Sequence, residues 1–192
     1  MSVPPPAPAD LEDQAAWYAW YEQALADNPR RLAHITTVWR RGLSYAAFAD
    51  EPERFALTCL LHDVGRGLDP ADQAPHALVG ARFLRDLGLP GPLVALVAQH
   101  TGARYEAALR GFPELETEFP YTPSGDLDML TYIDGTTGPD GAVLDAQARL
   151  ADIAVRYGED AWQVAAFRPI FDEIERGYDR CYPLVVPSIW QV

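Results

Sequence analysis

The fold is decided by the stretch LLHDVGR at residues 60–66, where a strongly apolar run ends in an adjacent histidine and aspartate. Phe55 and Leu57 continue the run backwards at helical spacing and Pro52 marks its start, so residues 52–63 are predicted to form a buried helix. An imidazole and a carboxylate directly after a buried run cost free energy unless each finds a partner. One interpretation is a helix end that emerges into water. The other is a metal site, because these two groups suit Zn, Mn or Fe.

Apolar residues recur at helical spacing along almost the whole chain. Asp10 is a candidate cap for the first helix, and Pro29 begins a second one. Further helices are expected over residues 76–87, 92–100, 104–109, 125–134, 143–157 and 160–178. Residues 65–75 are expected to form a loop that contains Asp69 and Asp72.

The two ends of the chain lack helical signals. Clustered prolines in residues 1–9 remove backbone donors and fix φ, so this segment is expected to be a flexible leader. Residues 182–190 look extended, but Pro183 and Pro187 indicate an irregular tail. No internal repeat and no linker rich in glycine or serine divides the rest. The expected fold is therefore all-α, with a single helical domain over residues 10–192.

Composition narrows the classes of partner. The chain has 192 residues, enough for one domain with a sizeable core, and a formal net charge of −13. A field of this sign repels phosphate backbones and anionic lipids, so neither nucleic acid nor a membrane is expected as a partner. All 15 basic residues are arginines, which excludes lysine Schiff-base chemistry and a P-loop lysine.

The cellular location is predicted from the absence of three signals, namely a disulfide framework, a signal peptide and a membrane span. Cys59 and Cys181 stand far apart without a CxxC motif, so both are expected to be reduced thiols. The N-terminal residues show no signal-peptide pattern, and no apolar run approaches the ~20 residues of a membrane span. A cytoplasmic protein is expected.

The chain has only four histidines. A single histidine on a helix is usually a packed or solvated side chain, but the surroundings of these four make each a candidate ligand. His62 belongs to the His-Asp pair, and His34 lies at the edge of the apolar face of the preceding helix, where it can reach a neighbouring helix. His76 and His100 open and close predicted helices further along the chain.

A lone histidine on one helix, a His-Asp pair ending the next and a later aspartate resemble the HD-domain superfamily of metal-dependent phosphohydrolases. The resemblance covers residues 31–134. It assigns the four-ligand pattern of this superfamily to His34, His62, Asp63 and Asp134. Asp126 and Asp128 lie on the same predicted helix as Asp134 and are alternatives for the last position, which the Tyr-Ile-Asp-Gly context of Asp134 favours.

Two further segments are similar to the binuclear branch of the superfamily. Residues 76–84 (HALVGARFL) resemble its "H…GA..L" element, and residues 99–102 (QHTG) resemble the segment with its second added histidine. The resemblance therefore implies that His76 and His100 serve a second ion. The nearest analogy is to the bacterial dinucleoside-tetraphosphate hydrolases, although only 13 positions separate Asp63 from His76, a short loop for that group.

The resemblance implies a phosphohydrolase that cleaves a small phosphoester, expected to be a nucleotide, with a metal-activated hydroxide. One or two divalent ions per chain are expected, and Fe, Mn, Co, Ni, Zn and Mg are not distinguished. Where two ions bind, Asp63 would bridge them. Arg66 is the candidate for a catalytic contact with the substrate phosphate, although it could instead be a solvated loop residue paired with Asp69. Arg31 and Arg104 are weaker candidates for the same cleft.

Two other functions stay open at this point. One is a metal-binding regulatory or ligand-binding module of the same fold without turnover. The other is an oxygenase, because some diiron members of the superfamily oxidise C–H bonds. The expected partner is a small phosphorylated substrate, and a homodimer is possible.

Overall fold

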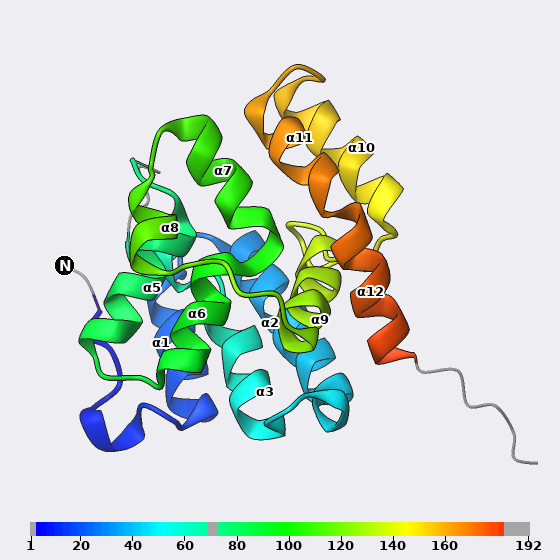
Figure 1. Cartoon of the computed structure of the whole chain (residues 1–192). Helices are drawn as coiled ribbons and strands as arrows, with labels where there is room; N and C mark the ends of the chain where they lie inside the picture. The colour runs from blue at the N-terminus through cyan, green and yellow to red at the C-terminus, as the bar shows by residue number, and fades with distance from the viewer. Residues whose placement is uncertain (1–2, 69–72, 183–192) are drawn as a thin grey trace, which may run out of the picture.

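The computed structural model describes residues 3–68 and 73–182, and this part of the chain is built of helices (Figure 1). Its only β-type pairing is an isolated antiparallel bridge between Thr137 and Val143. The all-α prediction is confirmed. The α-helices are α1 (Gln14–Ala24), α2 (Pro29–Tyr45), α3 (Pro52–Leu61), α4 (Val64–Leu68), α5 (His76–Asp86), α6 (Gly91–Gln99), α7 (Ala103–Arg110), α8 (Glu114–Glu118), α9 (Gly125–Gly135), α10 (Ala146–Tyr157), α11 (Trp162–Phe167) and α12 (Phe171–Cys181).

Short 3-10 helices and capping residues set the helix ends. The 3-10 helices are η1 (Pro8–Asp10), η2 (Ala46–Phe48), η3 (His100–Gly102) and η4 (Arg168–Ile170). The Asn28 side chain accepts a hydrogen bond from the Arg31 amide and so caps α2. The predicted cap of the first helix was wrong, because Asp13 caps α1 whereas Asp10 ends η1.

Three apolar clusters hold the helices together. The largest lies among α1, α3, α5 and α6 and includes Trp17, Leu61 and Leu78. A second joins α2, α3 and α9, and a third packs α10 against α11 and α12. In Figure 1 helices α10–α12 stand together on one side of the molecule, with α12 against α9. The third cluster therefore holds α10, α11 and α12 together as a helical layer beside α9.

Several predicted boundaries differ from the structure. Residues 64–68 are helical, so the predicted loop begins later, and Asp69 and Asp72 lie outside the described residues. Helix α8 was not predicted. The helix expected over 143–157 begins only after its cap Asp145, and the one expected over 160–178 is broken near Pro169 because proline cannot donate in a helix interior.

The two chain ends are described only in part. In the segment expected to be a flexible leader, the Val3 carbonyl accepts a hydrogen bond from the Trp20 indole N–H at 3.1 Å, and Val3 packs against the main core. Of the predicted tail, Tyr182 is described and the rest lies outside the described residues. Within the described part of the chain, no helix is both long enough and apolar enough to cross a bilayer.

A close crossing of α4 and α5 connects the His-Asp pair to His76. A Cβ atom built on Gly65 would lie 2.0 Å from the His76 carbonyl oxygen and 2.8 Å from the Gly80 amide nitrogen. These two helices can therefore touch only because Gly65 lacks a side chain. The crossing brings His76 close to the end of α3.

We expect Gly65→Ala to lower the free energy of unfolding by about 1–3 kcal/mol or more, because the added methyl group meets backbone atoms that cannot rotate away. Urea denaturation measures the loss. Gly67→Ala on the same short helix is the matched control, since its Cβ would meet only Trp20 at 3.5 Å, an ordinary contact. Equal stability of the two variants would contradict this account of the crossing.

Candidate metal centre

Six buried side chains form two groups of possible metal ligands at the centre of the fold. Each residue offers one ligand atom, and within a group these atoms lie within 4.8 Å of one another. The first group is His34, His62 and Asp134, and the second is Asp63, His76 and His100. The structure thus brings together all six residues that the sequence analysis named as candidate ligands.

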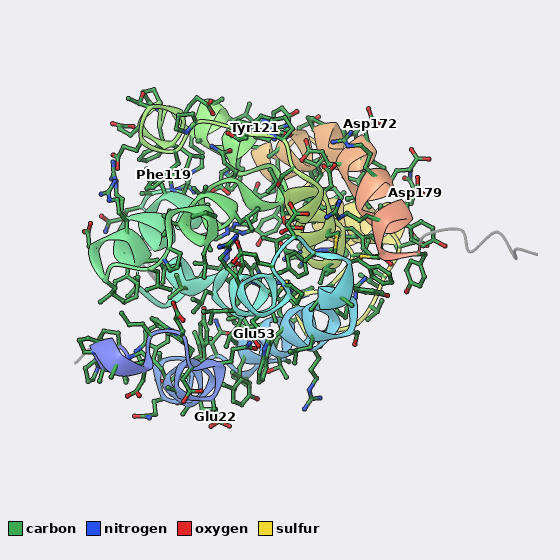
Figure 2. All side chains as sticks on the ribbon, turned by 60° about the horizontal axis from the view of Figure 1, so that its bottom comes forward. Glu22, Glu53, Phe119, Tyr121, Asp172 and Asp179 are labelled. Atoms are coloured by element: carbon green, nitrogen blue, oxygen red, sulfur yellow. The ribbon has the colours of Figure 1, made fainter. Side chains whose placement is uncertain are left out.

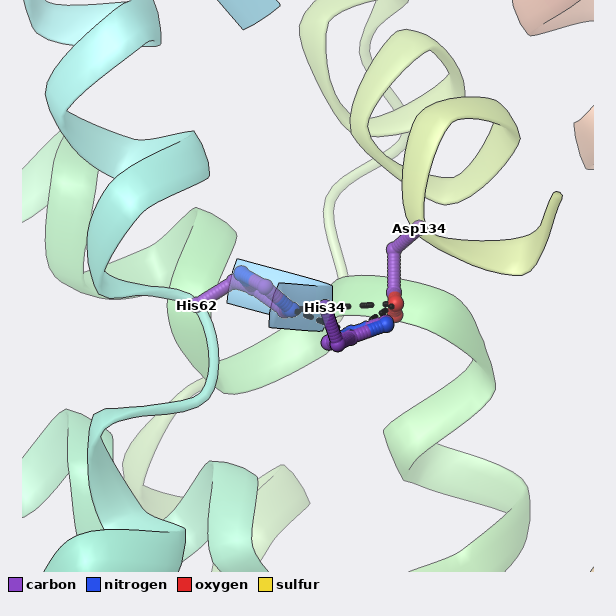
Figure 3. Close-up of side chains that lie close together, drawn as sticks. All are labelled: His34, His62 and Asp134. Atoms are coloured by element: carbon purple, nitrogen blue, oxygen red, sulfur yellow. Dashed lines mark hydrogen bonds and ion pairs between the residues drawn. The ribbon is translucent and has the colours of Figure 1, made fainter. Parts of the chain in front are cut away.

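The first group joins three helices (Figure 3). His34 lies in α2, His62 directly follows α3, and Asp134 lies in the last turn of α9. The Nε2 atom of His34 is 3.0 Å from Oδ1 of Asp134 and 3.3 Å from Nε2 of His62. Figure 3 shows the three side chains pointing toward one another, so their ligand atoms face a common point.

Asp63 faces both groups. Its Oδ1 atom is 3.1 Å from Nε2 of His76, which is itself 3.2 Å from Nε2 of His100. Its Oδ2 atom is 3.6 Å from Nε2 of His34 and 3.7 Å from Nε2 of His62. This carboxylate therefore lies between the two groups, one oxygen toward each.

Backbone carbonyls orient three of the four imidazoles. Nδ1 of His62 donates to the Cys59 carbonyl at 2.8 Å, and Nδ1 of His100 donates to the Val97 carbonyl at 2.6 Å. Both acceptors lie three positions earlier, where the end of a helix leaves its last carbonyls without amide partners. Nδ1 of His34 donates to the Gly138 carbonyl at 3.0 Å. Because a carbonyl only accepts, Nδ1 carries a proton in all three rings, and in the neutral form of each ring the lone pair is then on Nε2.

Protons on Nδ1 and lone pairs on Nε2 are the arrangement that a bound cation requires of these imidazoles. The Nε2 atoms of His34 and His62 face each other at 3.3 Å with a lone pair on each, so they cannot hydrogen-bond to each other. A metal ion that accepts both lone pairs removes this conflict. Imidazole nitrogens and carboxylate oxygens are also the donors that Zn, Mn and Fe take.

Asp134 is the acidic residue of α9 that faces the histidines. Its Oδ2 atom accepts a hydrogen bond from the Thr101 hydroxyl, which leaves Oδ1 for His34. Asp126 instead accepts from the Asp50 amide, and Asp128 pairs with Arg176. The two alternatives that the sequence left open therefore lie away from the candidate ligands.

The turn after Asp134 is fixed by Arg41. Its guanidinium donates to the Ile133 carbonyl at 2.6 Å and to the hydroxyls of Thr137 at 2.8 Å and Thr136 at 3.0 Å. These two threonines are buried, which gives them a structural role in the turn rather than a contact with substrate.

The charge states match those of metal ligands. Burial alone would raise the pKa of Asp63, but Arg31 and Arg66 bring it well below its usual range. Burial likewise opposes ionisation of Asp134, and the neighbouring His62 and His34 hold its pKa well below the usual range. Burial lowers the pKa of His62 to about 4, and burial together with Arg66 lowers that of His76 to about 3. Near pH 7 both carboxylates are charged and both imidazoles are neutral.

We expect the metal-free protein to lose stability as the pH falls below about 6.5, the pKa of histidine in an unfolded chain. The pKa values of about 4 for His62 and about 3 for His76 mean that the unfolded state binds more protons over this range. The free energy of unfolding should therefore fall by about 1.4 kcal/mol per pH unit for each of the two histidines. Denaturation curves of metal-free protein between about pH 6 and pH 5 measure this slope.

A His76→Asn variant is the control for this slope, because it should remove the contribution of one proton. A free energy of unfolding that stays constant over the same range would contradict the assignment of neutral, buried imidazoles.

A pocket opens from the candidate ligands toward α10 and α11. Its apolar lining includes Ile153, Tyr157, Trp162 and Phe167, from the layer beside α9. Four arginines also line it, namely Arg31, Arg66, Arg149 and Arg156. The lining acids are Asp63, Glu106 and Asp134. In contrast, Figure 2 shows acidic side chains such as Glu22, Asp172 and Asp179 at the outer surface.

The arginines named from the sequence have different positions. Arg66 Nε donates to Oδ1 of Asp63 at 3.1 Å, and Arg31 donates to Oδ2 of the same carboxylate. Both line the pocket, so they lie where a substrate phosphate could reach them. Asp69, the other partner considered for Arg66, lies outside the described residues. Arg104 does not line this pocket, because it pairs with Glu173.

Three pocket residues were missed by the sequence analysis. Arg149 and Arg156 lie seven positions apart on α10, which puts them on one helix face, but nothing in the sequence shows that this face covers the centre. Glu106 lies on α7, six positions after His100, and an acidic residue at such a spacing is common without any function.

Comparisons with known proteins give one family match and two partial relatives. The family model described as "HD domain" matches residues 26–157. Two proteins named Ribonuclease Y, from Chloroflexus aurantiacus and from Roseiflexus sp. strain RS-1, are each 46% identical to this chain over 41 residues. The match covers 21% of this chain and only 8% of each of those proteins. No solved structure matches the chain significantly.

Proposed function

Because the chain belongs to the HD-domain family of metal-dependent phosphohydrolases, we propose that it hydrolyses a small phosphoester, with a nucleotide as the expected class. The observation that carries this proposal is one carboxylate, Asp63, placed between two groups of ligands at the bottom of an arginine-lined pocket. This arrangement suits a two-metal centre.

The six side chains divide naturally between two divalent ions. His34, His62 and Asp134 would hold one, His76 and His100 the other, and Asp63 would contact both. When bound, such ions lower the pKa of a coordinated water and neutralise charge on a phosphoryl group. Thr101 keeps Asp134 in place, and the carbonyls of Cys59, Val97 and Gly138 keep three imidazoles in the ligand tautomer.

The arginines supply the recognition of phosphate. The whole chain has 28 acidic residues and 15 arginines, yet the pocket lining has four arginines and three acids, two of which are candidate ligands. The local field therefore opposes the overall charge and attracts an anion. Arg31 and Arg66 both contact Asp63, so a phosphate above this carboxylate would find two guanidinium groups within reach.

The same observation favours hydrolysis of a phosphoester over the two alternative functions. An oxygenase acting on C–H bonds has no general need for four arginines around its substrate. A regulatory module without turnover has no need for all six ligand side chains to converge. Ribonuclease Y is named for action on RNA, but a net charge of −13 opposes a long phosphate backbone, which favours a small phosphoester.

A phosphate-release screen combined with metal analysis tests the proposal. The purified chain is reconstituted with Mn, Fe, Co, Ni, Zn or Mg and given nucleoside mono-, di- and triphosphates, dinucleoside polyphosphates and an RNA oligonucleotide. We expect one or two ions per chain and metal-dependent phosphate release from a nucleotide. Oxygen-dependent product formation with bound iron would favour the oxygenase, cleavage of RNA alone would favour a nuclease, and binding without turnover would favour the regulatory module.

A further inference from the structure

Helix α10 contributes two arginines to the lining of the pocket, Arg149 and Arg156. Arg149 and Arg156 share one acceptor, Oδ2 of Asp152, at 2.7 and 2.8 Å. The side chain of Arg149 is only 14% exposed. One carboxylate cannot neutralise two guanidinium groups. Asp134 also attracts Arg149, but it is a candidate metal ligand, so its charge would be shared with a bound ion and the pair would keep positive charge for an anion.

Arg149 also has an unused donor. Its Nε atom is buried and has no hydrogen-bond partner among the described residues. A buried N–H of a charged group without an acceptor costs free energy, and a rotation of the guanidinium toward an anionic ligand in the pocket would recover it. The pair shares its pocket with Tyr157 and Trp162, whose rings offer apolar contact next to the charge. This wall therefore combines two arginines with an apolar surface.

We infer that Arg149 and Arg156 bind a second anionic group of the substrate, so that the substrate carries a phosphate or carboxylate besides the phosphoester that is cleaved. This inference rests on the proposed function, because it places the cleaved group above Asp63 and the second group against α10. Arg149 is then a specificity-determining residue. Arg31 and Arg66 serve the other end of the ligand.

Non-hydrolysable phosphonates test the second site without turnover. Titration calorimetry on metal-loaded protein compares methylphosphonate, which has one anionic group, with alkylene diphosphonates that have their two groups one to four methylenes apart. We expect at least one diphosphonate to bind about tenfold to a hundredfold more tightly than methylphosphonate, the gain from a charge-assisted hydrogen bond. Arg149→Ala should abolish that gain and leave methylphosphonate binding unchanged.

Arg168→Ala is the matched control, because this arginine is 61% exposed and lies outside the pocket. All proteins are compared at one free-metal concentration, so chelation by the probes cancels. The inference is overturned if the wild type shows no preference for any diphosphonate, if Arg149→Ala keeps the preference, or if Arg149→Ala weakens both probes equally. Binding as expected in a protein that hydrolyses nothing in the phosphate-release screen would reject the proposed function and keep the second site.

A second inference comes from the imidazole of His76, whose surroundings differ from those of the other three. Its Nδ1 atom is buried without a hydrogen-bond partner among the described residues, whereas the other histidines donate to carbonyls. Oε2 of Glu106 faces this atom at 3.8 Å, slightly too far for a hydrogen bond. The other oxygen of Glu106 accepts from Arg110 at 2.5 Å.

The geometry points to Glu106 as the positioning residue of His76. A small rotation of either buried side chain would let Nδ1 donate to Oε2, which fixes the Nε2 lone pair toward Asp63 and His100. Glu106 would then do for His76 what carbonyls do for the other rings. A carboxylate also raises the basicity of the imidazole, and so its affinity for a metal ion.

Metal titration tests this role independently of activity. We expect Glu106→Ala to weaken one of two bound ions by about tenfold to a hundredfold and to leave the other unchanged. Glu106→Gln should fall between, because its amide oxygen can still accept, and it covers the case in which the alanine variant fails to fold. Glu114→Gln, on the exposed surface, is the control. Unchanged affinity for both ions in a folded Glu106→Gln and Glu106→Ala pair would overturn the assignment.

Discussion

Replacing Asp63 by alanine is expected to remove bound metal and to lower turnover by more than about a hundredfold, beyond the loss typical of a residue that only supports a ligand. The reason is its position. Asp63 offers one oxygen to His76 at 3.1 Å and the other toward His34 and His62 at 3.6 and 3.7 Å. No other carboxylate among the described residues belongs to one ligand group and also faces the other. Both groups should therefore lose affinity together.

Metal content by mass spectrometry and the rate of phosphate release check this result on the same samples. The remaining histidines must then compete with protons for any residual ion, so we also expect that ion to dissociate more readily at mildly acid pH. Asp86→Ala, at an exposed position, controls for the loss of a carboxylate as such. Full activity of a metal-loaded Asp63→Ala protein would exclude the hydrolytic mechanism proposed above.

The candidate ligands could be named from the sequence because they leave local signals. His62 and Asp63 follow a buried helix, and His100 follows another, so each polar group stands where an apolar pattern stops. Their convergence over about 100 positions came from the resemblance to a family and not from the spacing. Asp134 shows the limit of local reasoning, since only the structure shows Asp126 and Asp128 paired elsewhere.

The pocket wall could not be predicted in the same way. Arg149 and Arg156 are ordinary members of an amphipathic helix, and their place in the pocket lining depends on the packing of α10 against α11 and α12. The role inferred for Glu106 depends on its distance from His76, which lies 30 positions earlier in the chain. Such contacts arise from tertiary packing and produce no periodic pattern of residue types in the sequence.

The same reasoning applies to the fold. A loop was expected over residues 65–75, but residues 64–68 form helix α4 although glycine lowers helix propensity. In the structure the absence of a side chain at Gly65 is what allows the backbone of α4 to contact that of α5. Glycine therefore disfavours the helix through its low helix propensity but permits the contact between α4 and α5, and the contact outweighs the propensity.

Replacing Arg66 by alanine is expected to lower kcat/KM by about tenfold to a hundredfold, the loss of one charge-assisted hydrogen bond worth about 1.5–3 kcal/mol. If Arg66 holds the phosphate equally in the ground state and the transition state, the change should appear mainly in KM. Steady-state kinetics on the substrate found in the phosphate-release screen measure it. Arg85→Ala, an exposed arginine on α5, is the matched control.

Metal content separates this role from that of Asp63. Arg66 contacts Asp63 at 3.1 Å, but Arg31 still contacts the same carboxylate when Arg66 is removed, so Asp63 keeps its charge. A guanidinium also repels a nearby cation, so its loss should not weaken metal binding. Arg66→Ala should therefore keep its ions while losing affinity for phosphate, whereas Asp63→Ala loses both. Wild-type kinetics in Arg66→Ala would limit this arginine to its ion pair with Asp63 and leave Arg31 as the phosphate contact at this end of the pocket.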